Sequence, residues 1–308
     1  YALLRHAGFR PQFVLASWIP EVAVCEAAAL KFPAAWLFPT VLVRVKVPGL
    51  GLVYLNDTDQ YAALGAAPHD GQLGLVVDHG RTERIAAAAD RRDAEELDYA
   101  IELDAEGNAD VSYSRTTRGD AFGGENRKFS EMPPEERRRY YEETVAGLSQ
   151  NAEAKGDLQT DFAGYPGTER FAARVANLAV RDGDYLYLTL PRSLHNLLGL
   201  RADERANPLF WGGPRRFRIV TRLTLPPDFD QTVLQPQEFF WNAPEAAGSV
   251  WVSVAREGAS SLRIIHDVDL KAAVLPATVY ANLLEVNRRL SHPAAGTVLL
   301  RRAPPAQP

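Results

Sequence analysis

The chain has 308 residues and a formal net charge of -5 at pH 7, and 46% of its residues are hydrophobic while 24% are charged. This balance is typical of folded proteins and excludes a disordered chain, and the acidic charge argues against a general nucleic-acid binder because phosphate affinity depends on clustered positive charge. Single hydrophobic cores stop growing at roughly 250 to 300 residues, so we expect two domains.

Membrane segments and disulfides are also excluded by the sequence. No run approaches the roughly 20 apolar residues that span a bilayer, so we predict no membrane span in this chain. The only cysteine, Cys25, rules out an internal disulfide and a multi-cysteine zinc site. The chain starts without Met in a helix-like segment, YALLRHAGFRP, so we expect an N-terminal part of the natural protein to be missing, and the compartment stays open.

The predicted first domain covers residues 1–90 and contains three strands. In VLVRVKV, the residues Val41, Val43, Val45 and Val47 alternate with polar or larger neighbours, the period-2 pattern of a half-buried strand. After a Pro-Gly turn, LVYLND is its predicted hairpin partner, and QLGLVVD at 72–78 is a third strand. The charged run RTERIAAAADRRDAEEL predicts an Ala-rich helical connector and a domain boundary near residue 90.

The predicted second domain, residues 91–308, is rich in strands. LDYAIELD and ADVSYSRTT flank a turn at 105–108 and predict a hairpin, and further strands are predicted at 185–191, 217–226, 249–258 and 262–270. Helical spacing of apolar residues predicts helices near 133–152 and 277–290. The predicted fold class is α+β, mainly β: a partial first domain followed by an antiparallel β-sandwich-like domain with one or two packed helices.

The first ~80 residues resemble a known family. The order LLRHAGFRPQFVLAS, FPTVLVRVKV and LVYLNDTDQYAALGAAPHDGQLGLVVD is similar to the elements that follow the nucleophile helix in bacterial transglutaminase-like proteins, which have a papain-type cysteine protease fold. The remainder resembles, less specifically, the β-rich tail domain of the same architecture. The resemblance implies a cysteine, histidine and aspartate triad, in which the nucleophile helix would precede this chain.

Two positions of this chain match that triad and differ from it. The family histidine falls on Thr40 and the family aspartate on Asn56. Asparagine can still orient an imidazole, as in papain-like proteases, but a threonine hydroxyl cannot shuttle a proton near neutral pH, which would remove a general-base contribution of ~10²- to 10⁴-fold. The resemblance therefore predicts a degenerate catalytic site at Thr40 and Asn56. Each residue also suits ordinary local structure, as Thr at a strand start and Asn before a turn.

Several other residues could have a catalytic or metal-binding role, or only a structural one. Cys25 is the only candidate for a displaced nucleophile, but a lone cysteine is more often a small buried residue. His69 and His79 lie beside Asp70 and Asp78 and could together bind a metal, although such residues are common in turns, and we predict no metal site and no cofactor. His6, His195, His266 and His292 receive no assigned role.

Two further patterns could serve binding. Arg216, Arg218 and Arg222 share one face of a predicted strand and could form a basic strip for an acidic glycan, or simply a solvated face. Phe210 and Trp211 precede a Gly-Gly turn and could stack on a ligand, or pack as cover for the core.

The sequence leaves three functions open. The first is a non-catalytic binding or scaffolding module, with a protein or peptidoglycan-like partner and, as the resemblance implies, a periplasmic or cell-envelope location. The second is an active cysteine acyltransferase or protease whose nucleophile lies in a missing N-terminal segment. The third is a β-sandwich glycan-binding or adhesion protein. Enzyme activity is therefore an open question, with the first function favoured.

Overall fold

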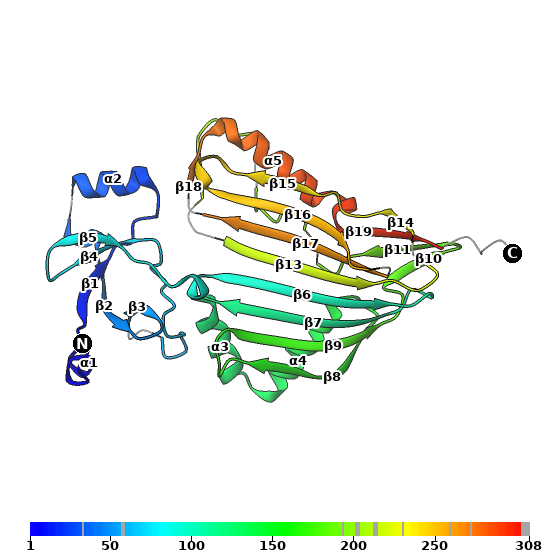
Figure 1. Ribbon diagram of the computed structural model, residues 1–308, viewed down its shortest axis with the longest axis horizontal. Helices are drawn as coiled ribbons and strands as arrows, with labels where there is room; N and C mark the ends of the chain where they lie inside the picture. The colour runs from blue at the N-terminus through cyan, green and yellow to red at the C-terminus, as the bar shows by residue number, and fades with distance from the viewer. Residues whose placement is uncertain are drawn as a thin grey trace.

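The computed structural model describes residues 1–32, 34–56, 59–192, 194–200, 204–211, 215–229, 231–258, 260–271 and 273–302. Strands form most of its regular structure, and the described part contains several antiparallel sheets with α-helices packed beside them (Figure 1). The predicted α+β, mainly β class is confirmed. No helix in the described residues is long and apolar enough to cross a membrane.

A five-stranded antiparallel sheet with the order β3-β2-β1-β4-β5 forms the N-terminal body. Its elements are α1 (Ala2–His6), β1 (Gln12–Ala16), α2 (Ala23–Lys31), the 3-10 helix η1 (Ala35–Leu37), β2 (Thr40–Val47), β3 (Gly51–Leu55), β4 (Leu73–Val76) and β5 (Arg81–Arg84). The predicted β2–β3 hairpin is present, with Val47 opposite Gly51.

The buried face of this sheet differs from the one that alternation suggests. Val14, Leu42 and Val76 form its core, and Arg44 on the same face is buried because its guanidinium bonds to Gln12 Oε1 at 2.9 Å and pairs with Glu83. A buried charge is tolerated when it is paired in this way. The polar residues of the VLVRVKV pattern are therefore partly inside.

The predicted Ala-rich helical connector is wrong. Residues 81–84 form β5, which pairs with β4, and the chain then extends through the single 3-10 turn η2 (Ala89–Arg91) into the next strand. Tertiary contacts override helix propensity here. Arg84 pairs with Glu26 on α2 at 2.9 Å and Ile85 is 1% exposed in the core, so the start of the run is held in extended backbone, and its end is held in β6.

A larger body follows, built on an eight-stranded sheet with the order β15-β16-β17-β13-β6-β7-β9-β8. Its elements are β6 (Ala94–Leu103), β7 (Ala109–Arg118), α3 (Ala121–Glu131), α4 (Pro134–Ala146), β8 (Ala152–Asp161), β9 (Gly167–Val175), β10 (Ala179–Asp182), β11 (Tyr185–Thr189), β12 (Leu209–Trp211), β13 (Arg215–Thr224), β14 (Gln231–Leu234), β15 (Phe239–Asn242), η3 (Pro244–Ala246), β16 (Gly248–Arg256), β17 (Ser261–Leu270), β18 (Ala273–Leu275), α5 (Ala277–Ser291), η4 (Pro293–Gly296) and β19 (Thr297–Arg301). Neighbouring strands are antiparallel except β6 and β13, which are parallel.

One face of the eight-stranded sheet, which we call the inner face, carries the main core. Leu97, Ile219 and Ile264 on this face pack in one cluster with Leu283 of α5 and Leu188 of β11. Helices and a four-stranded sheet with the order β10-β11-β19-β14 lie along this side (Figure 1). Among the described residues, α3, α4 and α5 lie on the inner side, and we call the opposite face of the sheet the outer face.

Most predicted elements of this body are present with shifted ends. The 105–108 turn joins β6 and β7, with Leu103 opposite Ala109. The helix predicted near 133–152 ends at Ala146, because the chain turns at Gly147 and begins β8 at Ala152. The helix predicted near 277–290 is α5, and α3, β8 and β9 were not predicted from the pattern.

Candidate functional site

Thr40 and Asn56, the two residues predicted to form a degenerate catalytic site, lie at the start of β2 and just after β3. Thr40 opens β2 and lies opposite Ala16 of β1. Asn56 follows the last residue of β3, where Leu55 lies opposite Val43. Continuing this register by one residue sets Asn56 opposite Leu42, so it lies two positions from Thr40 on the same face of the sheet. The two residues thus belong to neighbouring strands.

A cavity of about 230 Å³ opens beside Asn56, where the N-terminal body meets the segment that leads into α3. Thr40 does not line it. Its polar residues are Asn56, Asp59, His69 and Asp120, and its apolar walls are Leu42, Tyr54, Leu55, Ala62, Ala63, Leu64, Ala66, Ala67 and Pro68. We take this cavity as the candidate site because four side chains that can form hydrogen bonds or carry charge meet there from three separate segments.

The imidazole of His69 has a fixed orientation in this cavity. Its Nδ1 lies 2.8 Å from Gln72 Oε1. This contact fixes the plane of the ring and leaves Nε2 without a hydrogen bond to Gln72. Sequence reasoning considered His69 only as a metal ligand, and no spacing signal connects it with Asn56.

Carboxylates give the cavity a negative character. Burial raises the pKa of Asp120, the nearby Asp93 and Asp59 raise it further, and His69 acts in the opposite direction. Asp59 is partly neutralised, since its Oδ1 lies 3.0 Å from Arg127 Nη2 and also accepts the Tyr61 amide hydrogen. Two acids and one imidazole therefore share a small space.

No nucleophile accompanies these groups in the described part of the chain. Cys25 lies on α2, half-buried, and is not part of the cavity lining. A thiol must sit within hydrogen-bond reach of its base to be activated. The cavity lining thus offers two carboxylates, an imidazole and an amide, and it contains no thiol.

The histidines and acids considered for a metal have other partners. Asp70 accepts the Ala87 amide hydrogen at 2.6 Å and pairs with Arg92, while Asp78 accepts a hydrogen bond from Gln12. His79 Nε2 lies 3.5 Å from a Glu83 carboxylate oxygen. Within the described ranges, no three His, Cys, Asp or Glu side chains are arranged to hold a metal ion.

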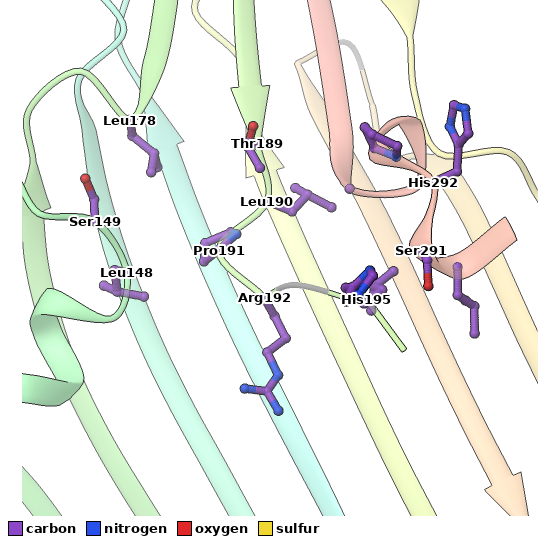
Figure 2. Close-up of a pocket in the computed structure, with 14 residues that line it drawn as sticks. Leu148, Ser149, Leu178, Thr189, Leu190, Pro191, Arg192, His195, Ser291 and His292 are labelled. Carbon is purple, nitrogen blue, oxygen red and sulfur yellow. The ribbon is translucent and has the colours of Figure 1, made fainter. Parts of the chain in front are cut away.

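A larger cavity, of about 430 Å³, lies on the inner side of the second body between β11 and the end of α5. It brings together His195 and His292, which sequence reasoning left unassigned, and Figure 2 shows them on different segments with Arg192 extending away from both. His292 Nδ1 accepts the Ala294 amide hydrogen and so serves as a cap for η4. The three basic groups do not converge on one point.

The structure shows the surroundings of the two candidate binding patterns, the arginine strip and the Phe210–Trp211 pair. Arg222 pairs with Asp98 at 2.7 Å, and Arg218 Nε lies 3.9 Å from Asp267, so the arginine strip is largely neutralised. Trp211 is 8% exposed and belongs to the main core cluster, so its ring serves packing, while Phe210 is 50% exposed. The Gly-Gly turn after Trp211 lies outside the described residues.

Comparison with known proteins gives limited similarity. No protein-family model matches the chain, and no curated protein matches it. A crystal structure of a protein from Parabacteroides distasonis, provisionally named a protease, is similar with a TM-score of 0.48 and 10% sequence identity. The similarity covers 97% of this chain and 41% of that one, so this chain spans about two fifths of its length. A likeness of this size assigns no family.

Proposed function

We propose that the chain is part of a transglutaminase-like module that has lost catalytic competence and acts in binding or scaffolding in the bacterial cell envelope. The observation that supports this most is Thr40, which opens β2 where the family pattern has histidine, on the strand next to Asn56. A threonine hydroxyl cannot act as a general base near neutral pH. The lining of the Asn56 cavity also contains no thiol.

The retained features suit binding better than catalysis. The cavity beside Asn56 has apolar walls and a few polar groups, the usual make-up of a ligand pocket. Its residues come from both bodies, because Asp120 precedes α3 while the others lie between β2 and β4. A ligand held there would be contacted by both parts of the chain.

Acyl transfer by the full-length protein tests this proposal. A glutamine-donor peptide and a primary amine serve as substrates, with Cys25→Ala as the control because Cys25 is not in the cavity lining. We expect no thiol-dependent turnover. Acyl transfer that disappears when one cysteine outside residues 1–308 is changed would contradict the proposal.

A second function has one specific observation in its favour. His69 lines the same cavity as Asn56, and its Nδ1 lies 2.8 Å from Gln72 Oε1, which orients the ring. An active cysteine acyltransferase or protease could thus draw its base from His69 in place of Thr40, with the nucleophile supplied from outside this chain. If this function is correct, His69→Gln removes the turnover of the full-length protein by about 10²-fold or more, while Thr40→Val leaves it unchanged.

A further inference from the structure

The outer face of the eight-stranded sheet carries an exposed aromatic pair. Phe240 on β15 and Trp251 on β16 are directly opposite residues of neighbouring antiparallel strands, so both rings stand on the same face. Phe240 is 62% exposed and Trp251 is 42% exposed. Two exposed aromatic rings side by side on one face of a sheet offer a surface on which a ligand can stack.

A continuous row of polar side chains extends from this pair across the sheet. The pairing registers set Trp251 opposite Asp267, Asp267 opposite Arg218, and Arg218 opposite Glu96. Each step crosses one strand, a spacing of about 4.8 Å, so the row from Phe240 to Glu96 measures roughly 19 Å. It continues to Thr116 and Thr168 on β7 and β9.

A cavity marks the middle of this row. Glu96 and Arg218 border a space of about 270 Å³ where the segment before β6 meets the outer face, and Arg216 and Arg118 line it as well. The Nε of Arg218 is buried and has no hydrogen-bond acceptor. The Arg218 side chain as a whole is 31% exposed, so the outer nitrogens of its guanidinium can donate hydrogen bonds to a ligand oxygen in the cavity.

The chemistry of this row matches one class of ligand. A sugar ring has an apolar face that stacks on an aromatic ring and a rim of hydroxyl groups that bond to carboxylate, guanidinium and hydroxyl side chains. A protein partner would need a larger apolar core than two rings supply. The charges on this face favour a neutral ligand over a polyanion. Arg218 faces Asp267 and Arg222 pairs with Asp98, so these positive charges are balanced by carboxylates.

We propose that this row is a binding track for a neutral oligosaccharide, with one sugar stacked on Trp251 and Phe240 and the chain running toward the cavity at Arg218 and Glu96. The track lies on the other body from Thr40 and Asn56, so it goes beyond the function proposed above and does not depend on it. The third function left open by the sequence, glycan binding, is thereby moved from the buried Trp211 to Trp251.

Binding of the full-length protein to an array of immobilised hexasaccharides tests the track. The array includes neutral β-1,4-linked glucose and N-acetylglucosamine chains and an acidic galacturonate chain, and hits are followed by calorimetry. We expect a neutral chain to bind, and Trp251→Ala to weaken its binding about tenfold, while Trp251→Phe retains most of it. Arg218→Met should also weaken binding, since it removes the guanidinium donors at the cavity.

Matched controls keep the result interpretable. Trp36→Ala removes a ring that is 66% exposed on the N-terminal body, and it should leave sugar binding unchanged. Thermal melting checks that each variant is folded, and Trp251→Phe covers the case in which Trp251→Ala does not fold. The proposal is overturned if no neutral chain binds, if only the acidic chain binds, or if folded Trp251 variants bind as tightly as the wild type. Capture of a protein ligand through Trp251 without sugar binding overturns it too.

Discussion

His266 is a titratable side chain enclosed in the core. It lies on the inner face of β17, is 2% exposed, and its Nε2 has no hydrogen-bond partner, while the ring bonds to the backbone of Ala295 in η4. Burial lowers the pKa of His266 to about 4, and the bond to Ala295 only partly offsets this. Between about pH 4 and pH 6.5, the folded protein therefore keeps this imidazole neutral, whereas the unfolded chain would bind a proton there.

Stability should depend on pH through this residue. The unfolded histidine titrates near its ordinary pKa of about 6.5, so the contribution of His266 is fully present above that pH and is lost as the pH falls to about 4, an amount of about 3 kcal/mol. Urea unfolding of wild type and His266→Leu at about pH 7.5 and about pH 4.5 measures it. We expect the variant to lose less free energy of unfolding on acidification. Equal losses in both proteins would refute this assignment.

Glu169 is a buried carboxylate whose removal should be costly. It is 1% exposed, accepts the Tyr140 hydroxyl hydrogen at 2.8 Å and lies 3.1 Å from Arg115 Nε. Breaking a buried pair leaves an uncompensated charge, so Glu169→Gln should lower the free energy of unfolding by about 3 kcal/mol. Glu142→Gln, which affects an exposed pair with Arg138, should change it by less than about 1 kcal/mol. Similar effects of both substitutions in urea unfolding would contradict the role of burial.

Among the secondary-structure elements, the hairpin that joins β6 and β7 depends on one glycine in its turn. Gly107 has a φ of 93°, and a Cβ there would lie 2.1 Å from the Ala179 carbonyl oxygen, whereas Gly183 in the β10–β11 turn has a φ of 57° and open space around it. Gly107→Ala should therefore cost roughly 3 kcal/mol and Gly183→Ala about 1 kcal/mol. Thermal unfolding compares the two variants, and equal losses would show that contact with Ala179 is unimportant.

Elements with clear periodicity were predictable, and elements that depend on packing were not. β2, β6, β7 and β17 alternate β-branched or aromatic residues with polar ones, so a local pattern specifies them. β8 has the sequence AEAKGDLQTD and lies at a sheet edge, and α3 contains two glycines, so neither shows a helix or strand pattern. The cavity beside Asn56 was likewise hidden, because His69 and Asp120 meet only through docking of the two bodies.

The two bodies of the molecule meet at a junction that is held by polar contacts. Tyr61 donates its hydroxyl hydrogen to Glu131 at 2.7 Å, Asn126 Nδ2 donates to the Tyr61 carbonyl, and Arg127 pairs with Asp59. All three partners in the second body lie on α3. This helix therefore holds the segment that carries the candidate cavity.

Two neighbouring glycines of α3 allow a matched test of the junction. A Cβ on Gly123 would lie 2.9 Å from Asp59 Oδ2 and 3.4 Å from Ala62 Cα, while a Cβ on Gly124 would meet nothing within 4 Å. Alanine favours a helix by about 1 kcal/mol over glycine, so Gly124→Ala should stabilise the protein. Gly123→Ala should loosen the junction and speed limited proteolysis between β3 and β4. Unchanged proteolysis in the Gly123 variant would show that the contact is dispensable.

The single parallel pair in the eight-stranded sheet has a consequence for how the chain reaches its structure. β6, β7, β8 and β9 form one antiparallel half of the sheet, and β13, β15, β16 and β17 form the other. Each half comes from one stretch of the chain, which is interrupted by α3 and α4 in the first half and by β14 in the second. The β6–β13 seam, where Glu95 meets Phe217, joins the strands that are farthest apart in the chain among the described pairs of this sheet, farther than β7 and β9, where Ala109 meets Val175. Closing such a long loop is slow, so the seam should be the last part of the sheet to assemble and the step that sets the folding rate.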